Sequence, residues 1–220
     1  MAKTKLQIHV ANDPVYYQNG TTVHLRDGGP CWIIDPGLPP QAQLIAQHVR
    51  EHSLEPEAIL ITHGHADHIA GIDEVRAELG EIPVYLAKVE WPTLTDPEHN
   101  LSSMMSAHLT TKVSDPRDLV PGKTLKLDGT TWQILDTSGH SPGGRSFYCA
   151  EHGIVIVGDA LFAGSVGRVD FPYSDGQLLM SNIHEYLMTL PDETRVLSGH
   201  GPDTTIGRER KTNPFIIHGL

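Results

Sequence analysis

The stretch THGHADH, residues 62–68, places three histidines and an aspartate within seven positions of a 220-residue chain that has 14 histidines in all. It continues the apolar run EAILIT, residues 57–62, which we interpret as a buried strand because unbroken apolar runs are typical of strands covered on both faces. Imidazoles and a carboxylate crowded together without a cation would be costly to desolvate. The stretch therefore predicts a metal-binding turn at the carboxyl end of a strand.

Three further ligand-type residues stand just past other predicted strands. His140, Asp159 and His200 follow apolar runs at 131–137, 153–158 and 194–198. A rigid sheet positions the loops that leave its strand ends, so we expect these side chains to gather at one edge. Glycines flank all of these motifs and let the backbone approach a small central object closely, and an ion fits that description.

The number of donors predicts two metal ions rather than one. Histidines 63 and 65 can reach one metal from the turn, while Asp67 and His68 leave the same turn towards a second. Neutral imidazole suits zinc, iron or manganese, and a carboxylate can bridge two cations. Seven donors suit two divalent ions, zinc before iron or manganese, each with an open position for water. The donors are His63, His65, Asp67, His68, His140, Asp159 and His200.

Other residues of these types have plainer interpretations. Asp159 in GDALF could be a helix N-cap, and Asp35 in IIDPG could be a turn former or a support for a metal ligand. The remaining histidines are interpreted as solvated or already satisfied by neighbours: His9, His24, His48, His52, His99, His108, His152, His184 and His218.

The rest of the chain alternates predicted strands and helices, which indicates an α/β fold. Asn19-Gly20 is a turn signal, a helix should begin at Pro39-Pro40, and SDGQ at 174–177 has the pattern of a capping box. A short polar tail should follow the last strand. The expected strands are 6–10, 21–25, 31–35, 57–62, 83–87, 123–128, 131–137, 145–150, 153–158 and 194–198, and the later helices are 69–80 and 175–190.

The segment 87–122 is irregular, with four prolines around a possible short helix near 100–108. A long irregular segment in a compact domain is typical of a lid or a binding loop. We interpret it either as a loop over the metal site or as a plain surface connection or dimer contact.

Composition limits the remaining possibilities. A hydrophobic content of 39% over 220 residues predicts one globular domain spanning 1–220, and the net charge of −11 disfavours nucleic acid as a partner. The N-terminus lacks the apolar run of a signal peptide and no stretch is long enough for a membrane span, so we expect a cytoplasmic protein without a membrane partner. Cys31 and Cys149 lie in apolar runs, and we expect buried thiols without a disulfide.

The motif His-x-His-x-Asp-His at 63–68, followed by Gly-His, Gly-Asp and Gly-His after successive strands, resembles the metallo-β-lactamase superfamily over nearly the whole chain. The resemblance implies an αββα sandwich of two mixed β-sheets flanked by helices, with a dinuclear site between the sheet ends. It also implies the ligand sets: His63, His65 and His140 for the first metal, Asp67, His68 and His200 for the second, and Asp159 as the bridge.

Within that superfamily, GDALFAGSVGRVDFP (158–172) and SGHGPDTTIGRERKTNPF (198–215) are similar to the glyoxalase II group, the hydroxyacylglutathione hydrolases, especially its short bacterial members. The resemblance implies hydrolysis of a thioester such as S-D-lactoylglutathione by a metal-bound hydroxide. Asp67 would be both a ligand and the group that orients the hydroxide. Arg168 would contact the glutathione, although a structural ion pair explains this arginine as well. True β-lactamases look less similar.

The resemblance leaves alternatives open. Twenty residues follow His200, so we expect no C-terminal glutathione-binding helical domain, and the substrate could be another ester or a lactone. GRVDF at 167–171 is similar to persulfide dioxygenases, in which a single iron would be held by His63, His140 and Asp159. A metal-binding scaffold without catalysis is a third possibility. We expect a small-molecule thioester or ester as the partner and a monomer or a small homo-oligomer.

Overall fold

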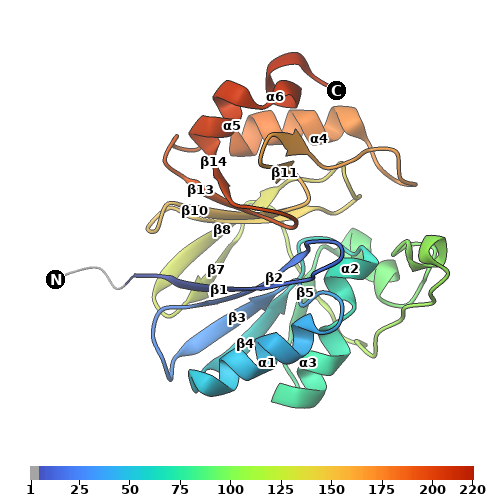
Figure 1. The fold of residues 1–220 in the computed structure, drawn as a ribbon, viewed down its shortest axis with the longest axis vertical. Helices are drawn as coiled ribbons and strands as arrows, with labels where there is room; N and C mark the ends of the chain where they lie inside the picture. The colour runs from blue at the N-terminus through green and yellow to red at the C-terminus, as the bar shows by residue number, and fades with distance from the viewer. Residues whose placement is uncertain (1–4) are drawn as a thin grey trace.

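Two six-stranded sheets face each other in the computed structural model, which describes residues 5–220 (Figure 1). The first sheet contains, in spatial order, β1 (Gln7–Asn12), β2 (Asn19–His24), β3 (Pro30–Ile34), β4 (Glu55–Leu60), β5 (Val84–Leu86) and β6 (Arg117–Asp118). The second contains β14 (Thr204–Thr205), β13 (Arg195–Ser198), β10 (Ile154–Gly158), β9 (Arg145–Cys149), β8 (Thr130–Asp136) and β7 (Thr124–Leu127). Both sheets mix parallel and antiparallel pairs. A small hairpin, β11 (Leu161–Phe162) and β12 (Ser165–Val166), stands apart from them.

Helices cover the outer face of each sheet, which completes the predicted αββα sandwich. The first sheet carries α1 (Gln41–Glu51) and α3 (Ile72–Leu79), and the short α2 (Ala66–Ile69) precedes α3. The second sheet carries α4 (Gly176–Asn182), which continues as the π-helical turn η3 (Ile183–Leu187), and then α5 (Ile206–Thr212) and α6 (Pro214–His218). In Figure 1 these two helical layers lie at the bottom and the top of the view, with the sheets between them.

The largest side chains lie between the two sheets. Trp32 of β3 and Trp132 of β8 meet with ring centroids 5.7 Å apart, and Phe147 and Leu60 are completely buried beside them. Each such side chain stabilises the fold by about 1.5–3 kcal/mol through burial of apolar surface. A second apolar cluster lies between the first sheet and its helices, and a third lies between the second sheet and its helices. The packing fixes the relative position of the two sheets, on which any site between their ends depends.

The strand directions bring the predicted ligand loops to one edge of the sandwich. β10 pairs in parallel with β13, and β8 runs in the same direction as β10 because β9 lies antiparallel between them. The loops after β8, β10 and β13 therefore leave the second sheet at the same edge, where they meet the loop after β4 of the first sheet.

Three predicted helices and turns differ from the structure. The helix expected at 69–80 is divided at Ala70-Gly71, because Gly71 packs so closely on Pro36 that a Cβ would lie 2.7 Å from the Pro36 carbonyl oxygen. The helix expected at 175–190 changes to a π-helical turn after Asn182. Asn19-Gly20 is not a turn but the start of β2.

The predictions of a capping box at 174–177 and of a polar tail after the last strand were also wrong. The N-cap of α4 is Asp175, whose carboxylate accepts a hydrogen bond from the Leu178 N–H, while the Ser174 hydroxyl donates to the His140 carbonyl. The tail forms α5 and α6, whose N-caps are Thr205 and Asn213. These caps have the expected residue types, but the surrounding polar sequence hid the helices.

The segment 87–122 contains two 3₁₀ helices, η1 (Lys88–Leu94) and η2 (Ser102–Met105), before the short edge strand β6. It appears in green at the right of Figure 1, beside α2. The carbonyl of Asn100 accepts a hydrogen bond from the Ala66 N–H at 2.9 Å, which fixes the segment to the start of α2.

Two expectations from composition are confirmed within the described residues. Cys31 and Cys149 are buried free thiols, and burial raises their pKa values to about 12 and about 11. Between residues 5 and 220, no helix has the length and apolar character needed to cross a membrane.

Candidate metal centre

Three of the predicted ligands form a tight group of nitrogens. Nδ1 of His65 lies 3.0 Å from Nε2 of His63 and 3.1 Å from Nε2 of His140. Zinc bound to imidazoles at 2.0–2.1 Å in a tetrahedral site separates its nitrogens by roughly 3.3 Å. The three histidines are buried, and their nitrogens therefore have the spacing of ligands to one ion.

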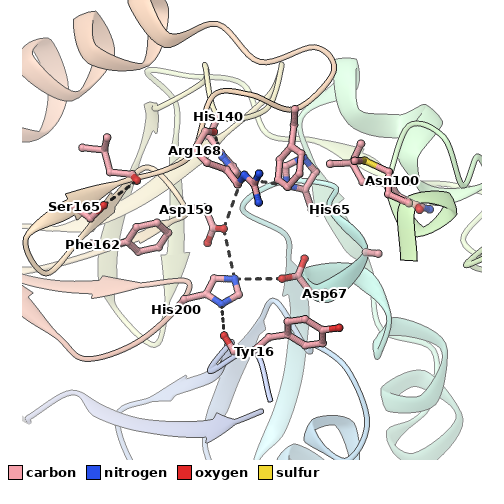
Figure 2. A pocket seen from close by; sticks show the side chains of 15 residues that line it. Tyr16, His65, Asp67, Asn100, His140, Asp159, Phe162, Ser165, Arg168 and His200 are labelled. Atoms are coloured by element: carbon pink, nitrogen blue, oxygen red, sulfur yellow. Dashed lines mark hydrogen bonds and ion pairs between the residues drawn. The ribbon is translucent and has the colours of Figure 1, made fainter. Parts of the chain in front are cut away.

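A second group stands next to the first. Asp67, His68 and His200 have ligand atoms within 4.8 Å of one another, with Nε2 of His200 3.2 Å from Oδ2 of Asp67. Asp159 lies between the groups: its Oδ2 is 3.6 Å from His140 Nε2 and 3.5 Å from His200 Nε2. Figure 2 shows His200 between the carboxylates of Asp67 and Asp159. All seven predicted donors are thus brought together, and the helix N-cap interpretation of Asp159 is wrong.

Two buried atoms at this centre have no hydrogen bond. Nε2 of His68 and Oδ1 of Asp159 are 3.4 Å apart, yet neither makes a hydrogen bond of acceptable geometry. Buried polar atoms in folded proteins nearly always have partners, because an unsatisfied group costs about 1–3 kcal/mol. These two atoms belong to the ligand groups, and a pair of metal ions bound there would satisfy both of them.

The outer nitrogens of the histidines are held by other groups. Nδ1–H of His68 donates to Asp35 at 2.9 Å, that of His140 to the Arg168 carbonyl at 2.7 Å, and that of His200 to the Tyr16 carbonyl at 2.8 Å. A donating Nδ1–H leaves the Nε2 lone pair directed at the centre, which is the usual arrangement behind metal-bound histidine. One buried carboxylate and two backbone carbonyls therefore fix the orientation of these imidazoles.

Asp35 combines both roles that its sequence allowed. It adopts a left-handed backbone conformation with φ of 49° after β3, and its carboxylate is buried. That carboxylate accepts hydrogen bonds from the Thr62 N–H at 2.8 Å and the Thr62 hydroxyl at 2.6 Å, in addition to His68. It connects the turn after β3 to the start of the ligand stretch.

Burial and neighbouring charges shift the pKa values of these groups in opposite directions. Burial, reinforced by His68, lowers the pKa of His63 well below its usual value, and burial together with His140 lowers that of His65 to about 3. Burial also opposes the charged form of His68, but Asp159 and Asp35 outweigh it and raise the pKa of His68 well above its usual value. His63 and His65 are therefore neutral near pH 7, the form that binds a metal.

A close backbone approach at Gly199 is necessary for this geometry. A Cβ at that position would lie 2.2 Å from Oδ1 of Asp159 and 2.9 Å from Cε1 of His68. The Gly199 N–H donates to the Gly158 carbonyl at 2.7 Å, which holds the His200 loop against the Asp159 loop. Any larger residue would displace two of the ligands.

A cavity of about 480 Å³ opens over the centre. Its walls come from the ligand loops, the hairpin β11–β12, the turn before β2 and the segment 87–122 (Figure 2). The segment supplies Asn100, Leu101 and Met104, so its interpretation as a plain surface connection is wrong. The other lining residues are Tyr16, His65, Ala66, Asp67, His140, Asp159, Phe162, Ser165, Val166, Arg168, Phe171 and His200.

Arg168 lines the cavity but already has an ionic partner. Its guanidinium donates two hydrogen bonds of 2.6 Å to Asp170 and stacks on Phe171, with 4.1 Å between Cζ and the ring centroid. The side chains of both ionic partners are more than half exposed. Both interpretations of this arginine therefore remain compatible with its position.

Several supporting residues were not predicted from the sequence. Glu90, on η1 and 1% exposed, accepts a hydrogen bond from the Gly143 N–H at 2.7 Å and so holds the loop after His140. The side chain of Asn19 donates to the carbonyls of Ser198 and Gly201, on either side of His200. Only Asn19 stood near a recognisable signal, the Asn-Gly pair, and that pair was read as a turn.

The family model described as Metallo-beta-lactamase superfamily matches residues 16–200. A relative from Bacillus subtilis, "Probable metallo-hydrolase YqgX", is 43% identical over 84% of this chain and 87% of its own length. A relative from Haemophilus influenzae, "Hydroxyacylglutathione hydrolase GloC", is 35% identical over 84% of this chain and 86% of its own.

Two solved structures are similar over almost their full length. "BLEG-1 B3 metallo-beta-lactamase" has a TM-score of 0.89 with 36% identity, covering 96% of this chain and 99% of its own. "TTHA1623 in a di-iron-bound form" has a TM-score of 0.80 with 36% identity, covering 94% and 99%. The chain is therefore similar both to proteins named as hydrolases of different substrates and to a protein that holds two irons.

Proposed function

Because the chain belongs to the metallo-beta-lactamase superfamily and is a metallo-hydrolase of that family, we propose that it is a dinuclear enzyme that hydrolyses thioesters. The observation that carries the proposal is the pair of adjacent, complete ligand groups on either side of Asp159 at the base of the cavity. An enzyme with one metal would not need the second ligand group, which Asp67, His68 and His200 form beside the first.

Two divalent ions held by these seven residues would supply a water acidic enough to ionise near neutral pH and would polarise a substrate carbonyl. Burial opposes the charged form of Asp67, but the neighbouring His68 and His200 lower its pKa, so the carboxylate is charged near neutral pH. Its carboxylate lines the cavity and can accept a proton from the attacking water. Asp67 would thereby orient the nucleophile toward the carbonyl carbon.

The leaving group of a thioester makes few demands on the protein. A thiol has a pKa of about 8.5, so it departs as a thiolate without a strong general acid. The apolar side chains around the cavity, including Phe162, Leu101 and Phe171, would exclude bulk water from the reacting carbonyl. The similarity to the relative named hydroxyacylglutathione hydrolase supports S-D-lactoylglutathione as the first substrate to test.

The first experiment is a count of metal per chain on protein purified without chelators, together with the rate of S-D-lactoylglutathione hydrolysis. We expect about two metal equivalents and turnover. His65→Ala removes the nitrogen that lies within about 3 Å of the ligand nitrogens of both His63 and His140. We expect this change to lower kcat by about two orders of magnitude or more while the fold remains. A His65→Ala enzyme with undiminished turnover would exclude the dinuclear mechanism.

Two other outcomes would identify different activities. One iron per chain with oxygen uptake on glutathione persulfide would indicate the dioxygenase, with His63, His140 and Asp159 as its ligands. The similarity to a B3 metallo-beta-lactamase favours a chromogenic cephalosporin as the second test substrate. Faster cleavage of that compound than of any thioester would replace the thioesterase proposal with lactam hydrolysis.

The role of Arg168 can be tested separately through its ion pair. If the guanidinium contacts an anionic group of glutathione, Arg168→Gln should raise KM and Asp170→Asn should lower it, because the variant Asn no longer competes for the arginine. A neutral thioester such as an N-acetylcysteamine ester is the matched control, and its KM should respond to neither change. Equal effects on both substrates would mean that the ion pair is only structural.

A further inference from the structure

A second group of histidines lies at the opposite edge of the sandwich from the metal centre. We propose that His24, His48 and His52, with His9 stacked beside them, form a separate binding site for a borderline transition-metal cation such as Zn²⁺, Cu²⁺ or Ni²⁺. This proposal does not depend on the proposed function. The sequence interpretation of these histidines as solvated or satisfied fits His24 and His52, which have hydrogen-bond partners, but not Nε2 of His48, which is buried without one.

The topology places the four rings together. β2 runs antiparallel to β3, so His24 at its carboxyl end lies far from the edge where β3 leads into the metal centre. The helix α1 returns along the sheet and brings His48 and His52, one turn apart, to the same end. His9 comes from the neighbouring strand β1. Gln7 pairs with His24 and so shares its face of the sheet, and His9, two residues after Gln7, lies on that same face.

The rings lie nearly as close together as those of the metal centre, although among the described residues only the groups at the metal centre have three ligand atoms within 4.8 Å of one another. The centroids of His24, His48 and His52 are 5.6, 5.8 and 4.4 Å apart. In the first ligand group the corresponding centroids, of His63, His65 and His140, are 4.5, 5.0 and 4.7 Å apart. Two histidines four residues apart on one helix face are a familiar zinc-binding arrangement.

The hydrogen bonds leave suitable nitrogens for an ion. Nδ1–H of His52 donates to the Asp27 carboxylate at 3.0 Å, and that of His24 to the Arg26 carbonyl at 3.3 Å. These are the partners that typically stand behind metal-bound histidine and leave Nε2 as the ligand. Nε2 of His48 is buried and has no hydrogen-bond partner, as is true of His68 at the metal centre.

The surroundings favour a cation over protonated imidazoles. The rings line a cavity of about 320 Å³ at the carboxyl end of α1, where the helix dipole attracts positive charge. Burial first, and then His9, His52 and His24, lower the pKa of His48 to about 4, although Glu51 opposes them. His48 is therefore neutral at pH 7 and has a lone pair to donate.

The rings must turn slightly to bind. His9 and His48 stack face to face, with centroids 3.9 Å apart and planes 5° from parallel, so their nitrogens do not yet converge on one point. A rotation of His48 about its side-chain torsions ends this stacking. We therefore expect this site to bind zinc more weakly than the metal centre does, with a dissociation constant on the order of micromolar.

The test is equilibrium dialysis against increasing free Zn²⁺, followed by metal analysis. The unmodified protein should bind one equivalent more than the double variant His48→Gln/His52→Gln, while both hydrolyse the same substrate at the same rate. The double variant His184→Gln/His218→Gln, which changes two exposed histidines elsewhere, should keep the extra equivalent. Equal zinc content in the unmodified protein and in His48→Gln/His52→Gln would overturn the proposal.

Copper provides a second measurement that does not depend on the double variant folding. Cu²⁺ added to protein that has zinc at the metal centre only, after dialysis has removed the more weakly bound equivalent, should give an electron paramagnetic resonance spectrum with nitrogen hyperfine structure. The single variant His52→Gln, at the more exposed end of the site, should weaken this binding by about tenfold or more. A spectrum that is unchanged in His52→Gln would also overturn the proposal.

Discussion

Asp35 shows how strongly one carboxylate can determine the chemistry of a neighbouring imidazole. It accepts hydrogen bonds from both the Thr62 backbone and hydroxyl, so it can hold His68 with Nε2 directed at the metals. The sequence suggested this supporting role only as one of two possibilities, because IIDPG is also an ordinary turn sequence. Its contact with His68 depends on the pairing of β3 with β4, which no local pattern reports.

Asp35→Asn tests this role. The amide nitrogen would replace either Oδ1, which sets its N–H against the Thr62 backbone N–H, or Oδ2, which sets it against the His68 Nδ1–H. Either arrangement opposes two donors. We expect a loss of about 10- to 100-fold in affinity for one of the two metals, since outer partners of metal-bound histidine typically contribute that much. Competition with a chromogenic chelator measures it, and Asp203→Asn, an exposed change on the second sheet, is the control.

His48 should make the fold sensitive to acid. Its pKa is about 4 in the folded protein and 6.5 in an unfolded chain, so between these pH values the unfolded state binds the additional proton and stability falls as the pH falls. The titratable groups that face it are His9, His52, His24 and Glu51. We expect the melting temperature to fall less between pH 7 and pH 5 in His48→Gln than in the unmodified protein. An identical fall in both proteins would contradict this origin.

At the scale of elements, the C-terminal helices hold one wall of the cavity. Glu209 of α5 is completely buried and accepts hydrogen bonds from the Gly164 N–H at 2.8 Å, the Asn213 side chain at 2.9 Å and the Thr204 hydroxyl at 2.5 Å. Gly164 is the turn of the hairpin β11–β12, which contributes Phe162 to the cavity. A helix that the sequence concealed in a polar tail therefore positions part of the site.

Glu209→Ala should lower the free energy of unfolding by about 2–4 kcal/mol, because it leaves the buried Thr204 hydroxyl and the buried Asn213 amide without this acceptor and releases the Gly164 N–H. Urea denaturation measures the loss, and Glu193→Ala, an exposed site before β13, is the matched control. We also expect KM to rise, since the hairpin wall loosens. A stability loss no greater than that of Glu193→Ala would mean that water replaces the carboxylate.

Local sequence predicted elements well where one physical signal dominated. Apolar runs marked the longer strands, and all of the metal ligands followed them, but the two-residue strands β6, β11, β12 and β14 were not predicted. The errors came where tertiary contacts decided: Gly71 divides a helix because Pro36 lies against it, and Asp175 rather than Ser174 caps α4 because the Ser174 hydroxyl bonds the backbone of His140. The four histidines from His9 to His52 escaped notice for the same reason, since three separate elements bring them together.

For the whole molecule, the metal centre connects the two sheets. His63 and His65 follow β4 of the first sheet, whereas His140, Asp159 and His200 follow strands of the second. The superfamily motif made this arrangement predictable, because its ligands are spread over the chain in a fixed order. The surface where substrate binds was less predictable, since its walls come from the irregular segment 87–122 and the small hairpin β11–β12.

Removal of the metals should therefore destabilise the entire fold. Ligands that bind only the native state contribute about 2.7 kcal/mol at a hundredfold excess over their dissociation constant, and each kcal/mol shifts the melting temperature of a chain this long by about 2–4 °C. We expect chelation to lower it by about 5–10 °C and zinc to restore it. The variant His48→Gln/His52→Gln should show nearly the same shift, which assigns the effect to the metal centre. A chelator without effect would show that the sheets hold together unaided.

The division of the ligands between the sheets also has a consequence for biosynthesis. A growing polypeptide exposes His63 to His68 early, but His200 follows β13, which is the last strand but one in the described residues 5–220. A ribosome-bound chain that lacks β13 presents a half-built cluster of imidazoles to the metal pool of the cell. The group of His63, His65 and His140 can form before that strand is made, whereas the group of Asp67, His68 and His200 cannot. We therefore expect the second metal to be loaded late in maturation, after the second sheet has closed against the first.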